Sequence, residues 1–203
     1  MKYLYIIGVL LIFIGLYLFV KIKSIKKDKS LIDVKTSIRN ISISAVLMAL
    51  AAILKVYSIM ITDQMRISLF ALPLILAGLT CGIEYGILAG LGADLVYSMF
   101  SAFPFNIAYT FSALFWGFLG GLFKLKKDNL KWYEIVIGII VVLLIETHIN
   151  LLSNLILYGK GTTLVLMFYK YVVVLIKIPV LSFLVWFLNE RVIKKVNKLW
   201  KMK

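Results

Sequence analysis

Cysteine, histidine and acidic residues are scarce in this chain of 203 residues. It has one cysteine, Cys81, and one histidine, His148. A single cysteine excludes a disulfide framework and a cysteine-based zinc site, and a single histidine argues against a histidine-clustered metal site. We therefore expect neither a metal nor a cofactor. Nine acidic residues against 23 lysines and arginines leave a net charge of +14, which needs its own explanation.

Hydrophobic residues, in contrast, are in excess. They make up 63% of the chain, and the mean hydropathy is +1.01. Soluble domains contain about 45–50% apolar residues, so the composition predicts an all-α integral membrane protein. A spanning helix needs roughly 17–25 mostly apolar residues. We expect helices at 3–20, 39–61, 68–82, 84–98, 107–123, 132–158 and 163–189.

The positive charges predict how these helices are oriented. Residues 21–39 hold seven lysines and arginines, residues 124–131 hold four, and residues 191–203 hold six. Seven spans put these three segments on one side, while the opposite loops hold only Arg66 and Lys160. Because positive residues collect in cytoplasmic loops, we expect a multi-pass protein of the cell membrane with its N-terminus outside and its C-terminus in the cytoplasm. The charge then reflects topology and attraction to lipid headgroups, and no nucleic acid partner is expected.

The first apolar segment differs from the others. It has one positive charge before it, seven after it, and no small-residue cleavage site. A cleaved signal peptide needs the reverse charge order and such a site. We therefore expect an extra transmembrane anchor helix at 1–20, a basic cytoplasmic linker at 21–37, and a six-helix membrane domain at 38–203.

Motifs for catalysis and nucleotide binding are missing. No HExxH, GxSxG or paired CxxC occurs, and Gly159–Thr163 lacks the upstream glycine of a phosphate loop. We expect a protein that is not an enzyme. If it transports a solute against a gradient, then ion coupling or a partner ATPase must supply the energy.

Small residues recur at helical spacing. This spacing lets helix backbones approach closely in lipid, and we expect the glycines to serve internal packing. They are Gly78, Gly82, Gly86, Gly90, Gly117 and Gly121. A second stripe, on the helix predicted at 39–61, either packs inside the bundle or docks another membrane protein. It consists of Ala45, Ala49 and Ala52.

Polar residues inside apolar segments are costly and usually functional. Counted at ~1.5 Å per residue from the outer helix ends, most of them lie in the outer half of the bundle. Such a set is typical of a cavity open to the outside. The set is Lys55, Asp94, Glu146, His148, Asn150, Asn154, Lys170 and Lys177.

Several of these side chains have a structural alternative. Glu146 and Lys177 come at similar depths and are expected to pair, and Asp94 is expected to pair with Arg66 across a loop. His148 is expected to be a packed histidine. The best pocket candidates are Asn150, Asn154 and Lys170. Aromatic residues near the outer ends either form an interfacial belt or stack on a planar ligand; they are Phe103, Phe105, Tyr109, Trp116 and Tyr158.

Short motifs give the chain a family resemblance over about residues 38–190. They are Arg66–Pro73, Ala77-Gly78, Gly82, Gly86, Gly90, Ala93-Asp94-Leu95, the Phe103–Asn106 loop, Asn150 to Gly159, and Lys177–Val180. In these places the chain resembles the substrate-binding (S) component of energy-coupling factor (ECF) vitamin transporters, and within them the folate-type group.

The resemblance implies a six-helix bundle that captures a vitamin, folate or a related pterin, from outside the cell. It implies docking through small residues of the first core helix (Ala45, Ala49 and Ala52) to a membrane coupling protein that carries two ATPase subunits. ATP hydrolysis would then topple the bundle and release the ligand inside. Where the folate-type group often has an arginine, this chain has Lys170.

The expected pocket combines charge, amides and aromatic rings around an anionic, ring-containing ligand. Its residues are Lys55, Arg66, Asp94, Phe105, Asn106, Tyr109, Asn150, Asn154, Tyr158 and Lys170. Another vitamin or precursor, such as a queuosine precursor, pantothenate or a thiamine precursor, is the main alternative. A membrane scaffold protein and an intramembrane enzyme are the other two.

Overall fold

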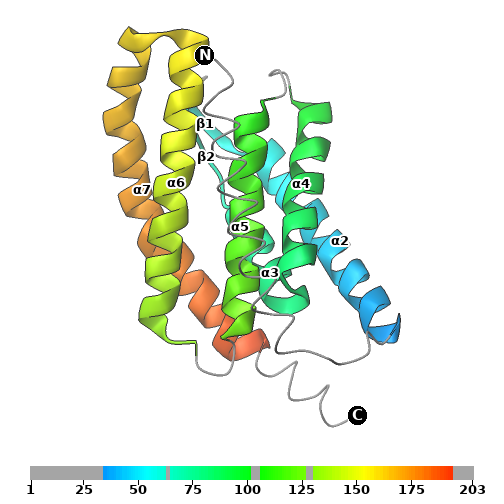
Figure 1. Ribbon diagram of the computed structural model, residues 1–203. Coiled ribbons are helices and arrows are strands. Elements are labelled where there is room, and N and C mark those ends of the chain that lie inside the picture. The colour runs from blue at the N-terminus through cyan, green and yellow to red at the C-terminus, as the bar shows by residue number, and fades with distance from the viewer. Residues whose placement is uncertain (1–33, 63–64, 102–105, 127–129, 194–203) are drawn as a thin grey trace. The chain divides into compact units, whose positions relative to one another are not determined.

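Helices make up most of the described chain, as predicted (Figure 1). The computed structural model describes residues 34–62, 65–101, 106–126 and 130–193, and it leaves the side chains of 34–36, 60–66, 157–158, 160–166 and 192–193 undescribed. The α-helices are α2 (Val34–Val56), α3 (Ala71–Cys81), α4 (Ile83–Phe100), α5 (Ile107–Leu125), α6 (Trp132–Tyr158) and α7 (Lys160–Leu188), and α7 runs into a π-helical turn, Asn189–Ile193.

The all-α membrane class is confirmed. Segments of α2, α5, α6 and α7 are long and apolar enough to cross a membrane, whereas α3 has only 11 residues. The chain divides into two compact units, Met1–Arg39 and Asn40–Lys203, and all of the sites discussed below belong to the second. The helix predicted at 3–20 and the linker up to residue 33 lie outside the described residues.

The helix predicted at 39–61 is too long at its C-terminal end. α2 ends at Val56, and β1 (Ile59–Thr62) pairs antiparallel with β2 (Met65–Ile67), with Ile59 opposite Ile67. β-branched residues favour this extended backbone. The pairing also satisfies backbone groups that would otherwise be exposed near the end of the apolar helix.

The next helix begins later than its predicted start at residue 68. Ser68 Oγ accepts a hydrogen bond from the backbone N–H of Phe70 at 3.2 Å, and α3 then begins at Ala71. Pro73 falls in the first turn of α3, where its missing N–H removes no helical hydrogen bond.

A tight turn joins α3 to α4, as the sequence predicts. Only Gly82 lies between the two helices, and its φ of 116° is a conformation that L side chains rarely adopt. Its N–H donates to the carbonyl of Gly78 at 2.8 Å.

Glycines bring α3, α4 and α5 into backbone contact, which confirms the expected internal packing. A Cβ at Gly78 or at Gly86 would collide with the carbonyl of Gly117, and a Cβ at Gly90 would lie 2.6 Å from the carbonyl of Ala113. α5 is accordingly the most enclosed of the candidate spans, with 72% of its window buried.

The remaining two helices form a long antiparallel pair beside α5. α6 and α7 lie side by side (Figure 1) and are joined through Gly159.

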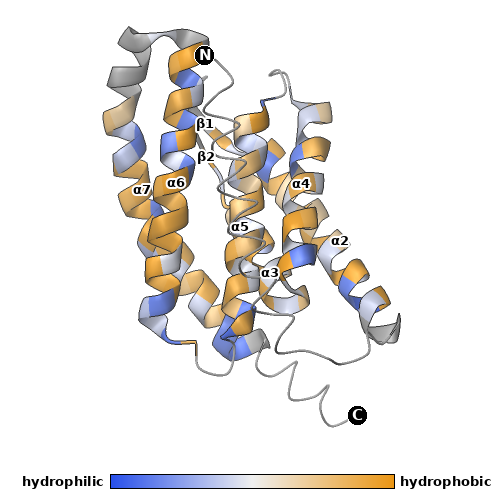
Figure 2. Cartoon of the chain, viewed as in Figure 1, coloured by the Kyte–Doolittle hydropathy of each residue, from blue (hydrophilic) through white to orange (hydrophobic). Residues whose placement is uncertain are grey.

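At the other end of α6, away from Gly159, Glu134 accepts hydrogen bonds from Lys126 Nζ at 2.5 Å and from the backbone N–H of Lys131 at 3.2 Å. This carboxylate raises the pKa of Lys126. Figure 2 shows hydrophilic residues at this end and hydrophobic residues along most of α6 and α7.

The glycine contacts predict that a single added methyl group at Gly117 destabilises the bundle. Gly117→Ala places a Cβ against the backbone of Gly86, where nothing can rotate away, and we expect a loss of roughly 1–3 kcal/mol. Gly138→Ala is the matched control, because its Cβ would meet only the ends of the Leu119 and Phe123 side chains. Thermal unfolding of both variants in detergent measures the difference; equal midpoints would contradict the prediction.

Candidate substrate site

Polar side chains line the contact between α5 and α6, in the half of the bundle that includes the start of α5 and the end of α6. We call this set the polar ladder. Its members on α5 and at its N-cap are Asn106, Tyr109, Ser112 and Trp116, and its members on α6 are Ser153, Asn154, Asn150 and Glu146.

Each member of the polar ladder is hydrogen-bonded to the opposite helix. Asn106 Nδ2 donates to Ser153 Oγ at 2.5 Å, and the Tyr109 hydroxyl donates to Asn154 Oδ1 at 3.0 Å. Trp116 Nε1 donates to Glu146 Oε2 at 2.9 Å. These bonds hold α6 at a fixed register against α5.

Helical periodicity explains why these residues meet. The members on α5 are spaced three or four residues apart, as are Glu146, Asn150 and Asn154 on α6, and such residues share a face. Ser153 lies next to Asn154 in the chain. Because the helices run antiparallel, the successive residues Tyr109, Ser112 and Trp116 meet, in reverse chain order, Asn154, Asn150 and Glu146. Asn106 also caps α5, since its Oδ1 accepts from the N–H of Ala108 at 3.0 Å.

Asn154 has an unused hydrogen-bond donor. The residue is fully buried, and its Nδ2 has no hydrogen-bond partner within the described part of the chain. A buried donor without a partner costs free energy of about 1–3 kcal/mol. Asn154 therefore lies in the polar ladder with one donor able to bind an acceptor.

The ion pair expected between Glu146 and Lys177 is not found among the ion pairs of the described residues. Glu146 is bonded to Trp116, and the cation that interacts with it electrostatically is Lys170. The depth estimate favoured Lys177 because it started the last helix at residue 163. α7 starts at Lys160, and these three extra residues move Lys170 about 4.5 Å closer to the depth of Glu146. The structure therefore brings Lys170 to the polar ladder from α7.

The pair expected between Asp94 and Arg66 lies outside the described residues, because the Arg66 side chain is not described. Asp94 has other partners that are described. Asp94, which is 3% exposed, forms an ion pair with Lys55 through Oδ1 and accepts from Thr110 Oγ1 through Oδ2 at 2.5 Å. The Lys55 ammonium also lies 5.0 Å from the ring centres of Phe70 and of Tyr97. We call these five residues the Lys55 cluster. Lys55 and Asp94 therefore pair with each other, and neither is bonded to a described member of the polar ladder.

Some predicted site residues lie outside the described part. Phe105 is not described, and the side chains of Arg66 and Tyr158 are not described. Of the predicted docking stripe, Ala45 and Ala49 are exposed, whereas Ala52 is buried at 2% exposure and packs into the bundle.

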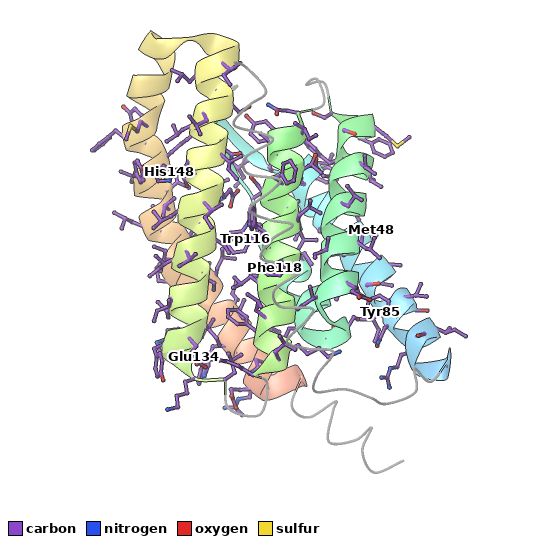
Figure 3. The ribbon with its side chains drawn as sticks, viewed as in Figure 1. Met48, Tyr85, Trp116, Phe118, Glu134 and His148 are labelled. Carbon is purple, nitrogen blue, oxygen red and sulfur yellow. The ribbon has the colours of Figure 1, made fainter. Side chains whose placement is uncertain are left out.

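The structure gives several residues surroundings that the sequence did not predict. Trp116, expected either in an interfacial belt or stacked on a planar ligand, lies inside the bundle (Figure 3). It is fully buried and donates a hydrogen bond to Glu146. Ser112 and Ser153 belong to the polar ladder, but serines inside helices commonly bond their own backbone, so their sequence signal is weak. His148 is exposed and connects α6 to α7 through the hydroxyl of Tyr171 at 3.3 Å.

Comparison with known families identifies the family of the chain. The family model described as "ECF transporter, substrate-specific component" matches residues 39–188, which is most of the chain. The chain belongs to this family. No curated protein matches it.

As an ECF substrate-specific component, the chain is a membrane protein that binds a small-molecule substrate and works with the subunits of an ECF module. The polar ladder offers hydrogen-bond donors and acceptors along the α5–α6 contact. No three His, Cys, Asp or Glu residues gather to hold a metal within the described ranges.

The bond between Trp116 and Glu146 predicts a measurable coupling in this component. Trp116→Phe removes the indole donor and leaves the carboxylate short of a partner, which should cost roughly 1–3 kcal/mol of stability. Adding Glu146→Gln should recover part of this loss, because the uncompensated charge disappears.

Thermal unfolding of the two single variants and the double variant forms the cycle that measures this coupling. Trp132→Phe, which changes a half-exposed tryptophan at the start of α6, controls for the loss of an indole. Additive effects of Trp116→Phe and Glu146→Gln would show that the two side chains do not interact.

Proposed function

We propose that this component captures a vitamin, folate or a related pterin, at the outer face of the membrane and delivers it inward. Delivery requires docking to a membrane coupling protein with two ATPase subunits. The chain carries no nucleotide-binding motif, which is consistent with ATP hydrolysis on a partner. In this proposal the N-terminus lies outside, the C-terminus is cytoplasmic, and the polar ladder opens outward.

The observation that carries the ligand proposal is the unused donor of Asn154. A buried amide with its oxygen bonded to Tyr109 and its nitrogen unbonded suits a ligand with an acceptor on a ring edge. Eight residues along α6, about 12 Å, separate Asn154 from Glu146, the residue to which Lys170 is attracted. A ligand that bridges these points would have ring acceptors at one end and a negative charge at the other.

A cation at Lys170 favours a ligand with a carboxylate, but folate is not the only such ligand. Lysine is a compact point charge and lacks the planar two-pronged donor set of arginine. Another ring-containing vitamin or precursor with a single anionic group is therefore the second candidate. Mass spectrometry of what copurifies with the detergent-solubilised chain, followed by titration with folate and other vitamins, distinguishes the two.

Lys170→Ala should weaken binding of an anionic ligand. Loss of a charge-assisted contact costs ~1.5–3 kcal/mol, so we expect the Kd to rise roughly tenfold to a hundredfold. Lys177→Ala, seven residues along the same helix, is the matched control and should leave the Kd within about threefold. Isothermal titration of the purified protein measures both, and an unchanged Kd for Lys170→Ala removes this residue from the site.

Ala49→Trp should abolish transport without changing ligand binding. Ala49 is exposed on α2, and an indole there blocks the close helix approach that small residues allow. We expect unchanged ligand affinity and loss of uptake in cells that contain the ECF module. Val46→Trp, an exposed position on the same helix outside the alanine stripe, is the control. Normal uptake by Ala49→Trp would exclude docking through this stripe.

A further inference from the structure

α2 is the least enclosed of the four candidate membrane spans. Only 17% of its spanning window is buried, against 72% for α5. Its exposed face includes Ala45 and Ala49. The helix therefore depends on a small number of contacts for its position.

Contacts of two kinds hold the second half of α2. Met48 packs against Gly92 of α4, and this apolar contact competes with lipid tails, which solvate a methionine equally well. The carbonyl of Leu54 accepts from Ser68 Oγ at 2.6 Å, and Lys55 forms the ion pair with Asp94. Lipid cannot replace these polar contacts.

The Lys55–Asp94 pair is the stronger of the two polar contacts by its chemistry. The side chains of Lys55 and Asp94 are 12% and 4% exposed, so separating them would leave a buried charge without compensation. Thr110 of α5 bonds the second carboxylate oxygen, and the rings of Phe70 and Tyr97 flank the ammonium. Lys55 of α2 is thus held by residues of α4 and by the residue before α3, and its partner Asp94 is in turn bonded to α5.

We propose that Asp94 is a positioning residue that, through Lys55, fastens α2 to α4 and α5 and so sets how Ala45 and Ala49 are presented to a docking partner. Both oxygens of Asp94 are bonded within the chain, so its role is between helices rather than on the ligand. The proposal rests on the docking role proposed above for α2. It adds that docking depends on a residue outside the docking surface.

Amide hydrogen exchange on the full chain in lipid nanodiscs tests the proposal. Asp94→Asn keeps the shape and an acceptor for Thr110 but removes the charge. We expect exchange across residues 40–56 to become on the order of tenfold faster, with exchange across 107–125 unchanged. Glu84→Gln, a change of an exposed acid on the same helix, is the control. Wild-type exchange of α2 in Asp94→Asn would overturn the proposal.

Asp94→Asn leaves the largely buried Lys55 charge without a partner, so the variant could exchange faster simply because it misfolds. Two double variants test for this. Lys55→Met with Asp94→Asn buries no charge and should fold, yet it should still show faster exchange of α2; wild-type exchange would overturn the proposal. Lys55→Glu with Asp94→Lys reverses the pair and should restore slow exchange and uptake. A merely space-filling role for Asp94 predicts no such rescue.

Ligand binding and uptake separate this proposal from the function on which it rests. Asp94→Asn should leave the Kd of the copurifying vitamin within about threefold and reduce uptake. A weakened Kd would instead put Asp94 in the ligand site and overturn the positioning role. If the wild-type chain binds no vitamin, or if Ala49→Trp transports normally, then the proposed function itself has failed.

Discussion

Backbone contact between α5 and the α3–α4 hairpin is the constraint on which the other features depend. Gly78, Gly86 and Gly117 allow it, because any side chain there would collide with main-chain atoms. In lipid no hydrophobic force drives helices together, so close van der Waals packing must do so. The turn at Gly82, with its positive φ, keeps α3 and α4 adjacent so that both reach α5.

This packing fixes the rotation of α5 about its axis. It therefore determines which side chains of α5 face α6 and which face Asp94. The face with Gly117 meets α3 and α4, and a second face displays Tyr109 and Trp116 to α6. Thr110, the neighbour of Tyr109, points to Asp94. One helix thus supports the glycine contact, the polar ladder and the Lys55 cluster, and a rotation of α5 would disrupt all three.

Local periodicity in the sequence predicted those features that a single helix defines. Glycines at helical spacing predicted close packing. Asn150 and Asn154, which are four residues apart and so share a helix face, both belong to the polar ladder. Partner choice across helices was predicted poorly, because depth was counted from assumed helix ends. α2 ends at Val56, not at residue 61, so Lys55 lies in its last turn, within reach of Asp94.

Hydrogen-bonding capacity distinguishes the two polar sites better than position does. Asp94 uses both of its oxygens within the chain, and Lys55 has an anion and two aromatic rings around it. Asn154, in contrast, uses its oxygen and leaves its buried nitrogen unbonded. A polar group whose hydrogen bonds are all made within the chain forms no new bond when a ligand binds, whereas an unused buried donor can form one. In the two roles we propose, the same kind of intramembrane polar residue serves helix position in one place and ligand recognition in the other.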